Sequence, residues 1–336
     1  MQNSTQRYTA EEIAAFHAYI LSSNSIYLSG GILITIMNCL LLAAMTKTLC
    51  QRRHMLLTEG IAVSQLLIGV SYIYLALYRY VIISFEIGEL ERWKCFFFGW
   101  YTFGFKLGET ESVLLFLFLA IDRFVSITFF RLPSKITAKL TQHIILVTNA
   151  INLIFVLSVA LYRIFKYDTK ISPFCSVSNL LSENYSHFQD ITLVVIMYIS
   201  VALYLFTFCS VLVKLNTSMS EVRRWNIKRE KSVLKRLSII LVAIVVSKAI
   251  PSTIFTVMTK SVSAQARMIM WMVDPITLSV NLWLYCLMES EIRKRIIQAY
   301  VTIGAHFQKF YTQIKEPLRP VGCKICRSKI HTSNTG

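Results

Sequence analysis

The chain has 336 residues, of which 55% are apolar and only 16% are charged, and its formal net charge is +17. A soluble globular domain has about a quarter of its residues charged, so this composition excludes an ordinary soluble protein. The basic residues are spread over many segments instead of forming one compact face, which argues against a nucleic-acid-binding protein. The composition therefore predicts a protein that is surrounded by lipid.

Seven segments are apolar and long enough to cross a membrane, for which a helix needs about 20 residues. Four of them contain no Lys, Arg, Asp or Glu, namely 13–46, 60–78, 140–162 and 191–213. Three more are interrupted by charged residues, namely 95–121, 237–259 and 268–288. We therefore expect an all-α membrane protein, a seven-transmembrane helix bundle with a short amphipathic helix after the seventh span.

The distribution of Lys and Arg predicts the orientation, because these residues gather on the cytoplasmic side of a membrane. Of the 35 Lys and Arg residues, 24 fall on one face of the expected bundle, 9 on the other, and Lys106 and Lys248 inside the membrane. This places the N-terminus outside, and we expect a multi-pass protein of the plasma membrane. The expected parts are an extracellular tail, the transmembrane domain, a membrane-surface helix and a cytoplasmic tail, at 1–25, 26–288, 289–304 and 305–336.

Two cysteines, Cys95 and Cys175, fall on the outer face, where oxidising conditions permit a disulfide. We interpret them as a disulfide that ties the second outer loop to the third span, and the alternative is two free thiols. Asn3 and Asn184 also fall outside, in Asn-x-Ser/Thr sequences. They are predicted glycosylation sites, although so short a pattern also arises by chance.

Short motifs at the inner ends of two spans give a more specific signal. The third span ends in Asp122-Arg123-Phe124, and the seventh ends in a run from Asn281 to Tyr285. Together with the seven spans, with Asn38 in the first and with Pro251 in the sixth, these motifs resemble the rhodopsin-like G-protein-coupled receptors. The resemblance extends over residues 27–297.

Several positions depart from the pattern of that family. The second span has Gln65 where the family usually has a sodium-binding aspartate, and the sixth lacks the tryptophan that normally precedes Pro251. The interval from Cys95 to Arg123 is also longer than usual. The chain is therefore similar to the divergent chemosensory branches of the family, such as the nematode serpentine receptors.

The resemblance implies that Asp122, Arg123, Phe124, Asn281 and Tyr285 couple the protein to a heterotrimeric G protein. An arginine at the edge of the membrane is costly unless it is paired or hydrated, and the adjacent Asp122 carboxylate can hold it as a latch that opens. The alternative is an anchoring arginine whose side chain reaches the interface.

Charged residues inside the membrane are functional candidates. In the family the third, sixth and seventh spans surround the ligand cavity, so the ligand-binding candidates are Lys106, Glu109, Lys248 and Asp274. Lys106 and Glu109 are three residues apart and share a helix face, whereas Glu111 points to another side. We expect Lys248 to pair with Asp274 or Glu109. The alternatives are a self-contained Lys106–Glu109 pair and a purely structural ion pair at Lys248.

We therefore predict a receptor that binds an extracellular small-molecule or peptide ligand and activates a heterotrimeric G protein. The seventh span has no lysine for retinal, and Phe105 occupies the position of the aspartate of amine receptors. A small polar or zwitterionic ligand and a volatile odorant both remain open. The partners include membrane lipid and no nucleic acid, and neither a cofactor nor a metal site is expected. The alternative is a secondary transporter with a charged site at the membrane midplane, and the sequence shows no enzyme motif.

Overall fold

Helices make up almost all of the structure. The computed structural model describes residues 10–45, 53–85, 87–128, 138–166, 170–175 and 180–216, and also 238, 242, 245–257, 293–295, 297–298 and 301. The elements are α1 (Ala10–Ala44), α2 (Arg53–Ser84), β1 (Leu90–Glu91), α3 (Arg92–Phe98), α4 (Tyr101–Thr128), α5 (Ala138–Lys166), β2 (Lys170–Ile171), α7 (Glu183–Asn216), the π-helical η1 (Val245–Ala249) and α9 (Ile250–Val257). The predicted all-α class is confirmed.

Within the part of the chain that the structure describes, four helices are long and apolar enough to cross a membrane, through Ser22–Ala44, Leu56–Ser84, Lys139–Lys166 and Asn184–Lys214. They contain the four segments that the sequence predicted from their lack of charge. Helix α4 has 28 residues and is about 42 Å long, so it also reaches across a bilayer, but it carries three charged residues in its first half. Elements η1 and α9 cover part of the expected sixth span. The expected seventh span lies outside the described residues.

Helix α1 begins at Ala10 and so runs through most of the segment 1–25 that was expected to be a tail. Residues 13–25 contain no charged side chain, and Ser23 and Asn24 are buried. The apolar helix therefore continues without interruption beyond the part that a bilayer requires. Six residues in the region of the expected amphipathic helix are also helical, including the exposed Ile297 and Val301.

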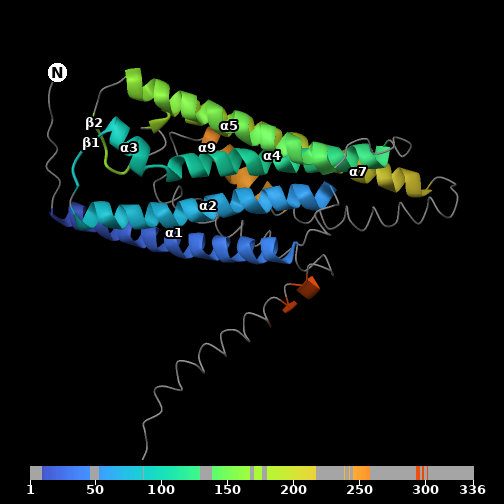
Figure 1. The fold of residues 1–336 in the computed structure, drawn as a ribbon, viewed down its shortest axis with the longest axis horizontal. Helices are drawn as coiled ribbons and strands as arrows, with labels where there is room; N and C mark the ends of the chain where they lie inside the picture. The colour runs from blue at the N-terminus through green and yellow to red at the C-terminus, as the bar shows by residue number, and fades with distance from the viewer. Residues whose placement is uncertain are drawn as a thin grey trace, which may run out of the picture.

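The long helices run along one common axis, and successive helices point in opposite directions (Figure 1). Helix α2 packs between α1 and α4, and α4 packs against α2, α5 and α7. The two short strands and α3 lie together at one end of the bundle, which we call the disulfide end. The opposite end, where α4 terminates, is called the Arg123 end. Helix α4 thus runs through the bundle from one end to the other.

Glycines allow α1, α2 and α4 to approach closely. A methyl group on Gly31 of α1 would lie 2.8 Å from the Gly69 carbonyl oxygen of α2. On Gly108 of α4 it would lie 2.8 Å from the Ser64 carbonyl oxygen. Gly104 and Gly108 are four residues apart, the spacing by which small residues bring membrane helices together. These contacts leave no room for a larger residue at Gly108.

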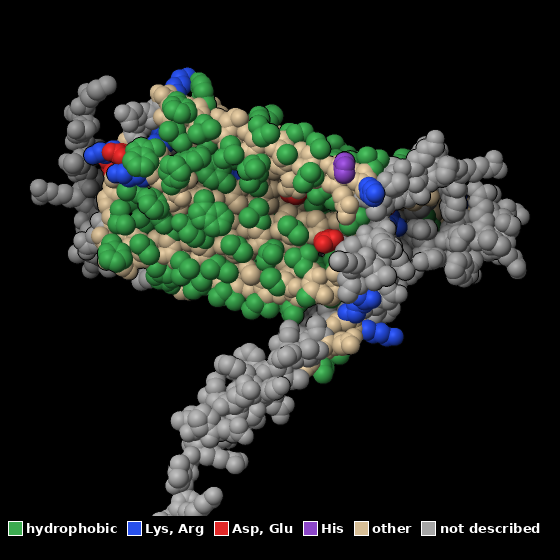
Figure 2. Space-filling view, in the orientation of Figure 1, with side chains coloured by type: hydrophobic (Ala, Val, Ile, Leu, Met, Phe, Trp, Pro, Cys, Tyr) green, Lys and Arg blue, Asp and Glu red, His purple; other side chains and the backbone are tan. Residues whose placement is uncertain are grey.

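Figure 2 shows hydrophobic side chains over the middle of the face that α5, α4, α2 and α1 form, whereas the visible Lys and Arg side chains lie mainly at the two ends. Large apolar residues such as Leu146 and Ile154 are well exposed there. Exposed apolar surface of this extent would aggregate in water. It is the surface that a helix bundle needs in hydrocarbon.

Candidate functional site

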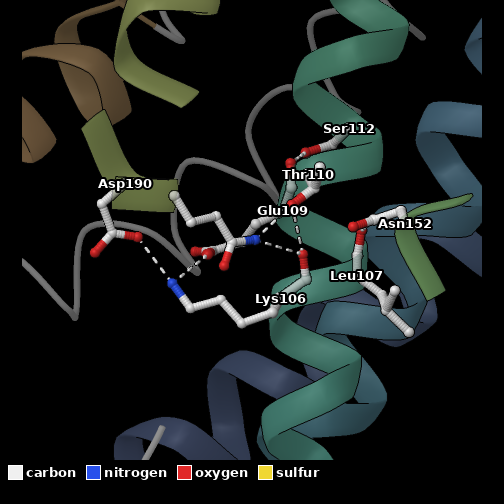
Figure 3. Close-up of polar contacts among 8 residues, drawn as sticks. Lys106, Leu107, Glu109, Thr110, Ser112, Asn152 and Asp190 are labelled. Carbon is white, nitrogen blue, oxygen red and sulfur yellow. Dashed lines mark hydrogen bonds and ion pairs between the residues drawn. The ribbon is translucent and has the colours of Figure 1, made fainter. Parts of the chain in front are cut away.

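A cluster of charged residues joins α4 to α7 in the half of the bundle nearer the disulfide end. The Lys106 side chain is buried, and its Nζ lies 2.8 Å from Oδ1 of Asp190 and 3.9 Å from Oε2 of Glu109 (Figure 3). The predicted shared face of Lys106 and Glu109 is therefore present. The stronger contact of the lysine, however, is to Asp190 on the other helix.

Hydrogen bonds fix the backbone around this cluster. Thr110 Oγ1 donates to the Lys106 carbonyl oxygen at 2.8 Å. Gln189 Nε2 donates to Thr110 Oγ1 at 2.7 Å and to the same carbonyl oxygen at 3.4 Å. The start of α7 is thus bonded to α4 through both charged and neutral groups, and the lysine is positioned on a rigid part of the helix.

The cluster contains one ammonium group and two carboxylates. The Lys106 side chain is 7% exposed, whereas that of Glu109 is 23% and that of Asp190 is 45% exposed. The lysine is therefore the interior partner, and the Asp190 carboxylate is the more accessible group. Such an arrangement can exchange its internal ion pairs for contacts with a charged ligand.

Asp190 was missed in the sequence, although it is the closest carboxylate to Lys106 among the described residues. It directly precedes the uncharged segment 191–213, and a charge at that position is naturally interpreted as the boundary of a membrane span. Only the packing of α7 against α4 brings it to Lys106. A search for a carboxylate at the same depth as Lys106 on every other span would have found it.

An apolar layer lies next to the charged cluster, towards the Arg123 end. It consists of buried residues from α4, α7 and η1, namely Val113, Leu193, Val194, Met197 and Ala249. The backbone of Lys248 lies in η1, directly before Ala249, and its side chain is outside the described residues. Asp274 also lies outside them, so the expected Lys248 ion pair stays a prediction.

A disulfide closes the bundle at the end nearer the charged cluster. Cys95 of α3 is bonded to Cys175, which lies 80 residues later in the sequence, and both residues are completely buried. Strands β1 and β2 pair antiparallel beside it. This confirms the predicted disulfide between the start of the third span and the second outer loop, which connects α5 to α7.

Three hydroxyl groups of α2 and α4 hold the backbone of the same loop. Tyr78 donates to the Pro173 carbonyl oxygen at 2.8 Å. Tyr101 and Thr102 donate to the Cys175 carbonyl oxygen at 3.1 and 3.3 Å. Cys175 has a φ of 43°, a left-handed conformation that is unfavourable for a residue with a side chain. The disulfide and these hydrogen bonds stabilise that conformation.

The expected third span is broken into α3 and α4 at Gly99. A methyl group on Gly99 would lie 2.9 Å from the Cβ atom of Cys175 and 2.6 Å from the Cys95 carbonyl oxygen. Only glycine therefore fits beside the disulfide.

The predicted coupling residues of the third span lie at the Arg123 end. An Nη atom of Arg123 is 3.5 Å from the Asp122 carboxylate, and both side chains are largely buried. The Phe124 ring packs against Phe206 of α7 with their centroids 5.7 Å apart. Asn281 and Tyr285 lie outside the described residues. The role of all five residues in coupling remains a prediction.

Of the remaining predicted positions, Asn38 and Gln65 are buried on α1 and α2. Asn38 Nδ2 donates to the Ile34 carbonyl oxygen at 2.9 Å, so its amide stabilises its own helix. Asn184 is exposed at the start of α7, as a glycosylation site would have to be. Asn3 lies outside the described residues.

The comparison with known families decides the identity of the fold. Residues 31–300 match the family model of the serpentine type 7TM GPCR chemoreceptor Srsx. The chain belongs to the Srsx family. No curated protein matches it. The family assignment confirms the expected seven-transmembrane bundle and the similarity to the serpentine chemoreceptors, and it makes this Srsx chain a multi-pass membrane protein of a receptor class.

Proposed function

We propose that this Srsx protein is a chemoreceptor of the plasma membrane, with its N-terminus outside, that binds a small extracellular ligand and activates a heterotrimeric G protein. The observation that supports the binding site is the cluster of Lys106, Glu109 and Asp190 between α4 and α7. It lies near the end of the bundle that the disulfide closes. A ligand would reach it from outside, next to a loop whose position is fixed.

The ligand that suits this cluster is a small polar or zwitterionic molecule. Its ammonium group would bind the Asp190 or Glu109 carboxylate, and its carboxylate would bind Lys106. Hydrogen bonds to charged groups contribute about 1.5 to 3 kcal/mol each. Replacement of the Lys106–Asp190 contact by contacts with a ligand would therefore change the free-energy difference between two arrangements of α4 and α7. The change is sufficient to shift the ratio of the two arrangements tenfold.

The same two helices carry the proposed coupling residues. Lys106 precedes Arg123 by 17 residues on α4, a distance of about 25 Å along the helix axis. At the Arg123 end, Phe124 contacts Phe206 of α7. A change in the α4–α7 contact at the ligand would thus reach Asp122, Arg123 and Phe124 through helices that touch at both places. Asn281 and Tyr285 would complete the G-protein surface from the seventh span.

A ligand screen with a promiscuous G protein tests this function. Once an agonist is found, Lys106→Met is expected to raise its half-maximal concentration at least tenfold. Arg123→Ala is expected to abolish nucleotide exchange while ligand binding remains. Lys94→Met is the matched control, because Lys94 is an exposed lysine at the disulfide end that pairs with Glu91 of the same turn.

Two results would refute the proposal. Unchanged agonist potency in Lys106→Met, Glu109→Gln and Asp190→Asn together would remove the cluster as the ligand site. Normal exchange in Arg123→Ala would remove the proposed coupling surface. Antibody access to an N-terminal epitope in intact cells, with no access to a C-terminal one, tests the orientation separately.

We also propose that Lys248 and Asp274 contribute to the ligand site from the sixth and seventh spans. The position of the Lys248 backbone next to Ala249, which packs in the apolar layer beside the cluster, supports this. The exchange of the two charges, Lys248→Asp with Asp274→Lys, is expected to restore folding but not the response to the original ligand. A fully restored response would show that the pair has only a structural role.

A further inference from the structure

A second site lies on the opposite side of α4 from the Lys106 cluster. A groove of about 300 Å³ opens between α2, α4 and α5, and its lining is mostly apolar. Its volume is at the lower end of the range for small-molecule sites. The polar residues that line it are Glu59, Ser64, Glu111, Gln142 and Asn149.

Glu111 is the unusual member of this lining. It is only 3% exposed, and neither of its carboxylate oxygens has a hydrogen-bond partner among the described residues. Asn149 is near enough to interact with it while its Nδ2 also donates to the Ile145 carbonyl oxygen at 3.1 Å, but no cationic side chain among the described residues pairs with the Glu111 carboxylate. A buried carboxylate without a partner costs several kcal/mol. A ligand that binds in the groove could reach the Glu111 carboxylate and pair with it.

The charge of the groove selects the kind of partner. The described residues that line it include the carboxylates of Glu59 and Glu111 and no Lys, Arg or His. Gln142 and Asn149 are exposed on α5, where neighbouring exposed residues such as Leu146 are apolar. Figure 2 shows acidic side chains interrupting the hydrophobic surface of this face. Amide oxygens and carboxylates accept hydrogen bonds, so a cation that donates them is the complementary group.

The depth of Glu111 determines the route of entry. It precedes Arg123 by 12 residues on α4, which corresponds to about 18 Å along the helix. In a hydrocarbon core about 30 Å thick, this position lies near the middle of the membrane. A partner therefore comes from the lipid and not from water.

We propose that this groove binds an amphiphilic amine that has partitioned into the membrane, with its ammonium group on the Glu111 carboxylate and its hydrocarbon chain along α2 and α5. An ammonium group supplies three donors and one positive charge. A fatty acid is repelled by two carboxylates, and a fatty alcohol leaves the charge of Glu111 unbalanced. The site is separate from the Lys106 cluster and does not depend on the proposed function of that cluster.

Photolabelling of the full chain in lipid nanodiscs tests this site. The probe is decylamine that carries a diazirine at the end of its chain, and the competitors are decylamine, decanol and decanoate. Labelling of α2, α4 or α5 is expected to saturate and to be displaced by decylamine at a concentration at least tenfold lower than by decanol. Decanoate is expected not to compete.

Two pairs of variants locate the amine. Glu111→Gln is expected to weaken binding at least tenfold, whereas Glu109→Gln, on the other face of α4, leaves it unchanged. Val63→Trp is expected to abolish binding, because Val63 lines the groove and is exposed, so that the larger ring fills the space without entering the core. Val70→Trp is its control, since Val70 is also exposed and lies two turns along the same face of α2.

Each contrary result overturns the proposal. Equal competition by decanol and decylamine, or unchanged binding in Glu111→Gln, means that the groove holds only a lipid chain. Unchanged binding in Val63→Trp places the amine elsewhere, and loss of binding in Glu109→Gln places it at the Lys106 cluster. Val63→Trp keeps the test decisive if Glu111→Gln does not fold.

Discussion

At the disulfide end, a covalent bond, a two-stranded sheet and hydroxyl groups from α2 and α4 all hold one short stretch of loop. At the Arg123 end, by contrast, α4 and α7 meet through apolar side chains, including those of Leu119 and Tyr204 and the ring pair of Phe124 and Phe206, and Arg123 forms an ion pair with its own neighbour in sequence. The first set of contacts crosses between segments that are far apart in the sequence. The second contains an ion pair whose loss leaves the helices packed. The difference indicates that the disulfide end is fixed and shapes the proposed ligand site, whereas at the Arg123 end the arginine can exchange one ion-pair partner for another.

Removal of the disulfide is expected to have the largest effect on the difference between the two ends. Cys95→Ser should lower the free energy of unfolding by about 2 to 4 kcal/mol, because the bond closes a long loop in the unfolded chain. The thermal midpoint of the purified protein in detergent measures this. Cys39→Ser, at an exposed free cysteine, should leave the midpoint unchanged. Equal midpoints for both variants would show that the disulfide does not stabilise this end.

The hydroxyl group of Tyr101 is the next contribution to the fixed end. Tyr101→Phe removes the donor to the carbonyl oxygens of Phe174 and Cys175. Thr102 still donates to Cys175, but the Phe174 carbonyl oxygen loses its hydrogen bond from Tyr101, which costs about 1 to 3 kcal/mol. The loop should then exchange its amide hydrogens faster. In the control, Tyr80→Phe removes only a 3.3 Å contact with the exposed Ser25. Unaltered exchange in Tyr101→Phe would mean that the disulfide alone fixes the loop.

At the Arg123 end, a small change in charge should alter activity more than stability. Asp122→Asn removes the carboxylate charge that lies 3.5 Å from Arg123 but keeps an oxygen that accepts a hydrogen bond from the guanidinium group. A loss of about 0.5 to 1 kcal/mol from this contact corresponds to a two- to fivefold rise in ligand-free nucleotide exchange. The thermal midpoint should stay within about a degree of the parent. Glu91→Gln, which removes an ion pair at the disulfide end, should leave basal exchange unchanged. A basal rate that does not rise in Asp122→Asn would contradict the latch.

The smallest expected effect is a dependence on pH at the disulfide end. Hydrogen bonds from Lys94 and then Trp93 hold the pKa of Glu91 below its ordinary value of 4.5. Because the folded state lowers this pKa, the stabilisation is present above pH 4.5 and is lost as the pH falls through the lowered pKa. The group is solvent-exposed, so the loss is small. Amide hydrogen exchange at Leu90–Glu91 is measured in the parent protein and in Glu91→Gln, at pH 7 and below pH 4. The two proteins should exchange at different rates at pH 7 and at the same rate below pH 4.

The sequence was sufficient to find the helices that hydrocarbon surrounds. The uncharged segments correspond to α1, α2, α5 and α7, because a span in lipid must satisfy its backbone internally and exclude charge. The same rule located the polar interruptions of α4. The predicted topology also identified the disulfide, since Cys95 and Cys175 were the two cysteines that fell on the outer face.

The partners of those charged residues depended on information that periodicity does not contain. Asp190 meets Lys106 only because α7 packs beside α4, and Gly99 lies at the turn between α3 and α4 against Cys175, which is 76 residues later in the sequence. The small-residue pair of Gly104 and Gly108 was present in the sequence and would have predicted the close contact of α4 with another helix. Which helix it contacts, and thus which side Glu111 faces, follows only from the assembled bundle.

The π-helical element η1 makes the orientation of α9 sensitive to the deletion of one residue. A π turn contains one residue more than an α turn, so its conversion to an α turn would rotate α9 by about 100° relative to the chain before it. We expect a single deletion within Val245–Ala249 to turn Thr253 away from Tyr198, which it now contacts at 3.1 Å. A disulfide between cysteines placed at these two positions would report the rotation. A single π turn therefore sets the direction in which the side chains of α9 point.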